Sequence, residues 1–219
     1  MKYRPIFITA TNTDIGKTYA TCKLIKELSS QGLQVGVFKP IETGVEEYPI
    51  DGKLLLETAQ QYNDNLKSFT CRDIVPIQFK LPAAPFVASD GEKIDFETIR
   101  RAYEKIAKVS DVVLIEGAGG LMVPVDEDIF MYDFIREFDA VTLLVTHANL
   151  GCINDTLLNQ GLLDSLEVDY EWCVNFRDNK EAFEKTTLPY YGKVISLQED
   201  IKLLSQNLLK SYRGKLCNT

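Results

Sequence analysis

Short apolar runs alternate with amphipathic stretches along most of the chain. The apolar runs, each predicted to form a strand, are 6–8, 35–38, 111–115, 140–145, 170–174 and 193–195. The amphipathic stretches, each predicted to form a helix, are 17–30, 95–108 and 154–166. The run 111–115 is nearly continuous in β-branched residues, which is typical of a parallel strand buried on both faces. This alternation predicts an α/β fold, a doubly wound and mostly parallel sheet with helices on both faces.

Glycine-rich or polar loops follow the predicted strands. They cover residues 10–18, 39–44, 116–120 and 146–151. In an open parallel sheet, ligands bind outside the carboxyl ends of the strands, so these loops are expected to meet at one site.

The loop after the first strand reads ATNTDIGKT over residues 10–18 and opens a helix at Gly16-Lys17-Thr18. Backbone N–H groups and the helix dipole at such a start favour a phosphate. The Lys17 ammonium reaches terminal phosphates, and the Thr18 hydroxyl can ligate Mg²⁺. We therefore predict a P-loop NTPase-like sheet. The loop is a variant, because a strict P-loop has glycine where this chain has Thr11.

Two further charged residues end predicted strands beside that loop. Glu116 is placed as the acidic residue that serves Mg²⁺ in P-loop enzymes, and Gly117-Ala118-Gly119-Gly120 lets backbone approach a ligand. Lys39 is placed to neutralise charge on a transferring phosphoryl group.

Three other residues leave alternatives open. Asp14 either favours the dipole of the following helix or lies near the bound phosphates or metal. His147, the only histidine, has no metal or triad spacing around it, so we interpret it as a polar loop residue. Cys152 is interpreted as a small buried thiol at a helix start, where N–H groups can bind a carboxylate.

Composition limits the partners and the location. The length of 219 residues and the absence of a linker predict a single domain, 1–219. The net charge of −8 argues against nucleic acid or an acidic membrane surface as the main partner. Five cysteines without a C-x-x-C pair, at 22, 71, 152, 173 and 217, indicate free thiols in a reducing compartment. No signal peptide or membrane span is recognised, so we expect a cytoplasmic protein.

Taken together, four stretches resemble the dethiobiotin synthetase family. They are Thr11 to Thr18, Phe38-Lys39-Pro40 with Thr43-Gly44, Glu116 to Gly120, and Leu150-Gly151-Cys152-Ile153-Asn154. They occur in the family's order over residues 1 to about 175. The family's phosphate loop has one extra residue, which accounts for the failed strict pattern.

The resemblance implies an ATP-dependent cyclo-ligase of biotin biosynthesis. Its substrates would be 7,8-diaminononanoate, CO₂ or bicarbonate, and ATP or another nucleoside triphosphate, with Mg²⁺ as cofactor. One amine takes up CO₂ as a carbamate, whose oxygen attacks the γ-phosphate to give a carbamic-phosphoric anhydride. The second amine then closes the ureido ring and expels phosphate.

The same resemblance implies roles for individual residues. The nucleotide would contact Asp14, Ile15, Gly16, Lys17, Thr18, Tyr19, Asp51, Glu116, Gly117, Ala118, Gly119 and Asn175. Mg²⁺ would be held by Thr18, Asp51 and Glu116. The substrate would contact Thr13, Thr43, Gly151, Cys152, Ile153 and Asn154, the last four from the neighbouring subunit of a homodimer. Lys39 and Lys17 would be catalytic.

Some positions depart from the family pattern. Ala10 stands where the family usually has glycine, Phe86 where a Pro-His pair is common, and Asn149 where lysine is frequent. After Gly192 the chain lacks the proline expected where the family closes over the base. The base preference therefore stays open.

Two rival functions are a P-loop amidoligase on another substrate and a nucleotide-dependent switch or partitioning-type ATPase. The switch proteins carry an early second lysine in the phosphate loop, whereas residues 11–14 contain none. Lys39 and the 150–154 stretch also have no evident purpose in a switch.

Overall fold

The computed structural model describes residues 1–177 and 179–210, so Cys217 lies outside the described part. The described strands are β1 Ile6–Ala10, β2 Val35–Phe38, β3 Ile41–Thr43, β4 Ile77–Phe79, β5 Val112–Glu116, β6 Pro124–Asp126, β7 Ile129–Phe130, β8 Val141–His147 and β9 Tyr170–Asn175. The described helices are α1 Lys17–Ser30, α2 Ile50–Gln60, α3 Cys71–Ile74, α4 Pro85–Ala88, α5 Phe96–Lys108, α6 Asp133–Glu137, α7 Cys152–Ser165, α8 Lys180–Thr186, α9 Leu188–Tyr191 and α10 Ile201–Lys210.

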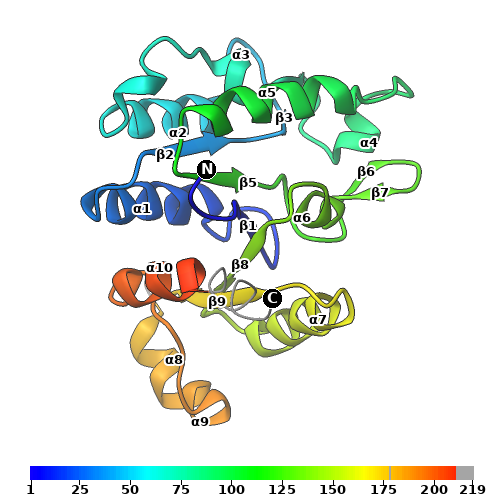
Figure 1. Ribbon diagram of the computed structural model, residues 1–219. Helices are drawn as coiled ribbons and strands as arrows, with labels where there is room; N and C mark the ends of the chain where they lie inside the picture. Colours follow the sequence, from blue (N-terminus) through cyan, green and yellow to red (C-terminus); the bar gives the residue numbers. More distant parts are fainter. Residues whose placement is uncertain (178, 211–219) are drawn as a thin grey trace, which may run out of the picture.

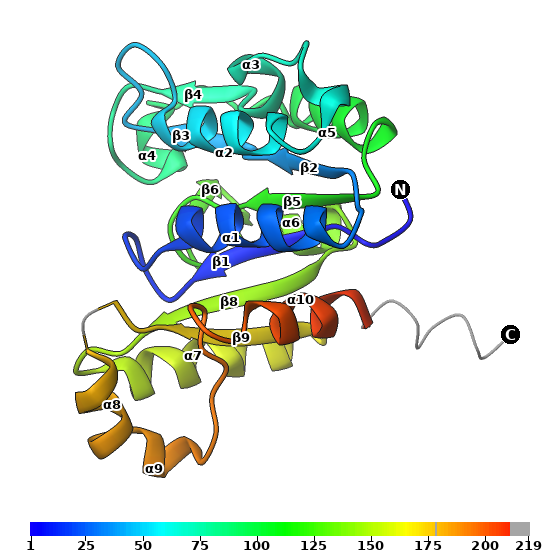
Figure 2. The ribbon, with the colours of Figure 1, turned by 90° about the vertical axis from the view of Figure 1, so that its left-hand side faces the viewer.

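A parallel five-stranded sheet in the order β2-β5-β1-β8-β9 forms the centre of the molecule. Helices cover both of its faces: α1, α2 and α10 lie on one side and α5, α6 and α7 on the other (Figures 1 and 2). Every residue of β1, β2 and β5 is buried. The predicted doubly wound α/β fold is therefore confirmed, with all pairs of the central sheet parallel.

Helix α1 shows how the sequence pattern produces this packing. Its buried positions include Ala20, Leu24, Ile25 and Leu28, the apolar residues that recur at helical spacing. The helix ends before Gly32, which has φ +84 and donates its N–H to the carbonyl of Ser29 at 2.9 Å. Such burial on one helix face against the sheet is the main source of its stability.

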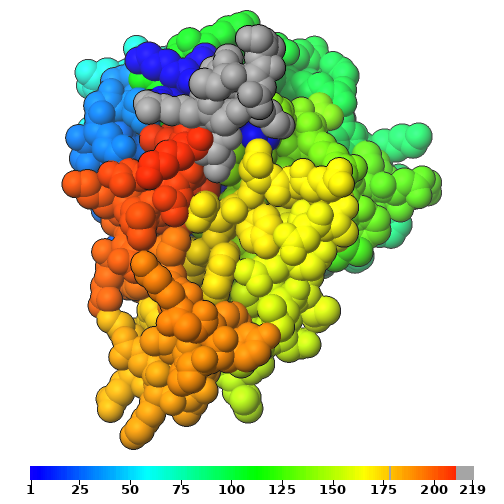
Figure 3. Space-filling model, turned by 60° about the horizontal axis from the view of Figure 1, so that its bottom comes forward, coloured from blue at the N-terminus to red at the C-terminus, as the bar shows by residue number. Residues whose placement is uncertain are grey.

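Two small strand pairs frame the carboxyl edge of the main sheet, which lies on the left in Figure 2. Strands β3 and β4 pair in parallel, and β6 and β7 form an antiparallel hairpin. Helices α8 and α9 project beyond β9, beside the surface that α7 contributes (Figures 1 and 3). Among the described helices, none has both the length and the apolar character needed to cross a bilayer.

The prediction of a strand over 193–195 is wrong. Only Ser196 bridges Val174, and the chain then turns, because the Ser196 N–H donates to the Asp200 carboxylate at 2.9 Å. Two other boundaries shift. Helix α5 starts at Phe96, with the Asp95 carboxylate accepting from the Thr98 N–H, and α7 starts at Cys152 rather than Asn154.

Candidate functional site

Loops from β1, β2, β3, β5 and β9 border a cleft of about 510 Å³ at the carboxyl edge of the sheet. The predicted site residues that line it are Thr13, Asp14, Gly16, Lys17, Thr18, Lys39, Thr43, Asp51, Ala118 and Gly119. The parallel topology thus gathers into one cleft residues that are more than a hundred positions apart in the sequence.

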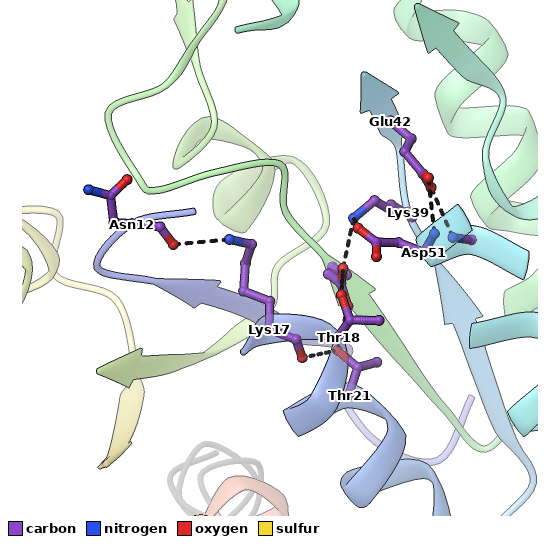
Figure 4. Close-up of polar contacts among 9 residues, drawn as sticks. Asn12, Lys17, Thr18, Thr21, Lys39, Glu42 and Asp51 are labelled. Atoms are coloured by element: carbon purple, nitrogen blue, oxygen red, sulfur yellow. Dashed lines mark hydrogen bonds and ion pairs between the residues drawn. The ribbon is translucent and has the colours of Figure 1, made fainter. Parts of the chain in front are cut away.

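The phosphate loop joins β1 to α1 and bends sharply before the helix. Gly16, the residue before the helix, has φ +112, and Asp14 has φ +58. The Lys17 ammonium is buried and donates to the carbonyl of Asn12 at 3.2 Å, across the loop (Figure 4). Burial lowers the pKa of Lys17, an effect that the charge of Glu116 partly opposes. The phosphate loop therefore surrounds the buried ammonium of Lys17.

Ala10, where the family usually has glycine, is the last residue of β1 and is fully buried. Extended backbone accepts a Cβ without strain. The close approach at this point comes instead from Gly120, because a Cβ there would lie 3.3 Å from the Ala10 carbonyl oxygen. The 116–120 loop thus passes directly beside the phosphate loop.

Glu116 is the centre of a buried polar cluster at the end of β5. Its carboxylate accepts hydrogen bonds from the Thr18 hydroxyl at 2.9 Å and from the Thr21 hydroxyl at 2.8 Å. It also accepts one from the Lys39 ammonium at 2.7 Å. The side chain of Glu116 is fully buried and that of Lys39 nearly so. This ion pair joins the loop after β2 to the first turn of α1.

Lys39 has a second carboxylate partner, Asp51, at 3.0 Å (Figure 4). Burial opposes the charge of Lys39, but Glu116 and Asp51 outweigh it and raise the pKa of Lys39. Asp51 is placed by Glu42, whose carboxylate accepts the backbone N–H groups of Asp51 and Gly52 at 3.0 and 2.9 Å. Burial in turn raises the pKa of Glu42. Helix α2 is thereby fixed with its acidic first turn toward the cleft.

Asn175 ends β9 and touches the phosphate loop from the other side. Its amide donates to the carbonyl of Ile15 at 2.7 Å and accepts from the Gln198 amide at 2.6 Å. Tyr19, the other predicted nucleotide contact on this side, has a half-exposed side chain.

The predicted substrate contacts Gly151, Cys152, Ile153 and Asn154 lie at the start of α7 and are not among the cleft residues of this chain. The Cys152 side chain packs against Val174 and Phe176. Burial raises the pKa of its thiol. The side chain is therefore unsuited to nucleophilic attack, as interpreted from the sequence.

His147 lies at the last position of β8, so the interpretation of it as a loop residue is wrong. Its Nε2 lies 3.0 Å from the Asp155 carboxylate, and its Nδ1 accepts the Asn149 N–H at 3.2 Å. These contacts join the end of β8 to the first turn of α7.

Several cleft residues escaped the sequence reasoning. Arg177 lines the cleft and donates to the carbonyl of Asp14, and Glu42 and Val123 also line it. The residues Pro82 to Pro85 form another wall, and Phe86 beyond them is substantially exposed. Arg177 had a signal, since it follows the carboxyl end of a strand. No sequence signal pointed to the wall formed by Pro82–Pro85, because its position depends on how the long segment between β2 and β5 folds back onto the cleft.

Comparison with known proteins agrees with the fold. Residues 4–171 match the family described as an AAA domain. The fold is similar to a plasmid partition protein from Borrelia burgdorferi, with a TM-score of 0.57, 12% identity, and coverage of 98% of this chain and 100% of that one. It is also similar to a ParA family ATPase from Chlorobium tepidum, with a TM-score of 0.53, 16% identity, and coverage of 98% and 94%. Fold and phosphate loop together define a P-loop-type α/β protein.

Sequence similarity is more specific. The chain is 46% identical to the ATP-dependent dethiobiotin synthetase BioD of Sulfurovum sp. (strain NBC37-1), over 86% of this chain and 90% of that protein. It is 34% identical to the protein of the same name from Wolinella succinogenes, over 95% and 99%. The chain belongs to the ATP-dependent dethiobiotin synthetase family.

Proposed function

We propose that this protein is an ATP-dependent dethiobiotin synthetase of biotin biosynthesis, a ligase that forms carbon–nitrogen bonds. The observation that carries the proposal is the position of Lys39. Its buried ammonium lies between Glu116 and Asp51 and lines the same cleft as Lys17 and Thr18. A second fixed cation facing a phosphate loop suits the transfer of a phosphoryl group to an anionic acceptor.

The proposed reaction starts from 7,8-diaminononanoate, CO₂ and a nucleoside triphosphate. One amine adds to CO₂ and loses a proton, which gives a carbamate. A carbamate oxygen then forms a bond to the γ-phosphorus while the bond to the nucleoside diphosphate breaks. The second amine attacks the carbamate carbon, loses a proton and expels inorganic phosphate, which closes the ureido ring.

We assign the anionic groups of this reaction to the two lysines. Lys17 would hold the β- and γ-phosphates above the helix start, where backbone N–H groups and the dipole also favour anions. Lys39 would lie beside the carbamate and the transferring phosphoryl group. Thr13 and Thr43 line the same cleft as Lys39 and would position the diamine.

Mg²⁺ is proposed to bind at Thr18, Asp51 and Glu116. These side chains offer only oxygen donors, the class that Mg²⁺ prefers. The Lys39 ammonium lies 3.0 Å from the Asp51 carboxylate and 2.7 Å from the Glu116 carboxylate, so both acidic side chains face a position that favours positive charge, which supports the proposal. The described residues include no cluster of three His, Cys, Asp or Glu side chains that could hold a metal, so phosphate and water oxygens would complete the ligand set. When bound, Mg²⁺ would neutralise charge on the phosphates.

The remaining assignments concern the base, the assembly and the location. Asn175 would contact the base, together with the loop 116–119. In a homodimer, the helix start at Gly151–Asn154 would bind the carboxylate of a substrate molecule held in the cleft of the neighbouring subunit. Leu150 is fully exposed there, and Leu157 and Leu158 of α7 are also exposed, which supports an apolar contact between copies. We further propose one domain over residues 1–219 and action in the cytoplasm, where ATP is available.

One assay tests the proposal. Purified protein is incubated with ATP, Mg²⁺ and bicarbonate, with and without the diamine, and both phosphate release and dethiobiotin are measured. We expect diamine-dependent phosphate release with one dethiobiotin per phosphate. The same rate of phosphate release with and without the diamine would instead indicate a switch-type ATPase. Stimulation by another amine without dethiobiotin would indicate an amidoligase. Repeating the assay with GTP and CTP defines the base preference.

A further inference from the structure

Asn175 lies in direct contact with the backbone of the phosphate loop. It is 4% exposed, and its Nδ2 donates to the Ile15 carbonyl at 2.7 Å. A Cβ added at Gly16 would lie 2.3 Å from the same nitrogen. The Asn175 amide therefore packs directly against the Ile15–Gly16 peptide. This peptide comes immediately before the first turn of α1, whose N–H groups face the phosphate site.

The orientation of this amide is set by Gln198, a residue between β9 and α10. The Gln198 Nε2 donates to the Asn175 Oδ1 at 2.6 Å. Its Oε1 accepts the backbone N–H of Phe176 at 3.3 Å, and its carbonyl accepts from the Lys23 ammonium at 3.1 Å. The preceding residue, Leu197, is fully buried and donates its N–H to the Val174 carbonyl at 2.9 Å. These contacts thus fix the backbone position of Gln198, from which its side chain extends toward Asn175.

Only one assignment of donors and acceptors fits these hydrogen bonds. A backbone N–H can only donate, so Phe176 requires the oxygen of the Gln198 amide. The Gln198 nitrogen then faces Asn175 and requires its oxygen, which leaves the Asn175 nitrogen for the Ile15 carbonyl. Reversing either amide would place two donors or two acceptors together in a mostly buried setting, which is costly. A backbone group of the β9 loop therefore determines which atom of Asn175 meets the phosphate loop.

We propose that Gln198 is a positioning residue for nucleotide binding, acting through Asn175 on the Ile15–Gly16 peptide. The proposal rests on the proposed function only in that the cleft binds a nucleotide. Gln198 itself is not among the residues that line the cleft, and the hydrogen bond of its side chain to Asn175 is the contact that continues to the phosphate loop.

The test is the isosteric variant Gln198→Glu, with binding of a fluorescent ADP analogue as the readout. The variant keeps an oxygen for the Phe176 N–H but turns a carboxylate oxygen toward the Asn175 Oδ1. We expect roughly tenfold weaker ADP binding, the effect of one misdirected buried hydrogen bond. Gln206→Glu, the same change at an exposed position on α10, should bind ADP as the wild type does.

A second arm asks whether Asn175 transmits the effect. In an Asn175→Ala background, Gln198→Glu should change ADP affinity less than twofold, since a coupled pair is not additive. A full effect in that background, or wild-type affinity in folded Gln198→Glu protein, overturns the proposal. Gln198→Ala provides the same comparison should the glutamate variant not fold. Because ADP binding needs no diamine, a failure of dethiobiotin formation in the wild type leaves this test intact.

Discussion

Lys39 combines deep burial with two acidic partners of different exposure. Glu116 beneath it is fully buried, whereas the Asp51 side chain is 45% exposed. The Lys39–Asp51 pair is consequently the easier one to open, because solvent can take over the hydrogen bonds of Asp51. Asp51 is therefore the partner that a ligand in the cleft can replace, while Lys39 keeps its ion pair with Glu116, whose carboxylate Thr18 and Thr21 also hold.

Replacing Lys39 should separate chemistry from binding. We expect Lys39→Ala to lose at least about a hundredfold in kcat, since a charge-stabilising group near the transferring phosphoryl typically contributes that much. ADP affinity should change little, because Lys17 and the helix start remain. Lys108→Ala, an exposed lysine of α5, is the matched control in steady-state assays. An unchanged kcat in Lys39→Ala would refute the assignment.

The lowered pKa of Lys17 predicts a pH effect on binding. The charges around it are Glu116, Lys39, Asp51 and Asp14. A bound phosphate favours the ammonium and raises that pKa, so binding requires proton uptake once the free protein has lost the proton. Nucleotide affinity should therefore fall as pH rises, starting below the ordinary lysine pKa of about 10.4.

Calorimetry in two buffers of different ionisation enthalpy measures that proton uptake directly. Lys17→Arg is the control, because its guanidinium stays charged over the whole range. The same uptake in Lys17→Arg would show that another group titrates.

At the scale of elements, helix packing on the sheet depends on close backbone approach at β2. A Cβ at Gly36 would lie 2.4 Å from the Ser110 Oγ and 2.7 Å from the Ile106 Cγ2. Gly36→Ala should therefore lower the free energy of unfolding by about 1–3 kcal/mol, the usual cost of overpacking. Urea denaturation checks this. Gly161→Ala in α7, where an added Cβ meets nothing within 4 Å, should be neutral or stabilising. Equal stability of both variants would contradict the close packing.

The sequence predicted the elements whose signal is local. Buried strands such as 112–116 are continuous apolar runs, and α1 has a regular apolar face. Helix α2 was missed because its first turn is fixed by the Glu42 carboxylate, a contact between separate segments. The 193–195 run looked like a strand, but the bridge to β9 is made only by Ser196 after it, because the chain then turns at Asp200. Likewise Lys39, Glu116 and Asn175 were predictable as residues at strand ends, whereas Gln198 required knowing which segment lies behind β9.

For the whole molecule, the proposed homodimer makes a distinct prediction. Leu158 of α7 is 67% exposed, and an aspartate there would place a charge in an apolar contact. Leu158→Asp should sediment as a monomer and lose diamine-dependent turnover while binding ADP normally. Leu203→Asp on α10, 39% exposed, is the control and should remain a dimer. A dimeric, fully active Leu158→Asp protein would exclude this face as the interface.

The charges that line the cleft have a consequence for how fast a nucleotide arrives. Three cations, Lys17, Lys39 and Arg177, face three carboxylates, Asp14, Glu42 and Asp51, so the lining is electrically balanced. The chain as a whole carries a net charge of −8. A trianionic or tetra-anionic nucleotide therefore meets no long-range attraction, and electrostatic steering does not raise its encounter rate above the ordinary diffusive level. Added salt should speed the encounter slightly, because it screens the overall repulsion. Discrimination between ligands then takes place after a ligand has reached the cleft, through the directed hydrogen bonds of the phosphate loop.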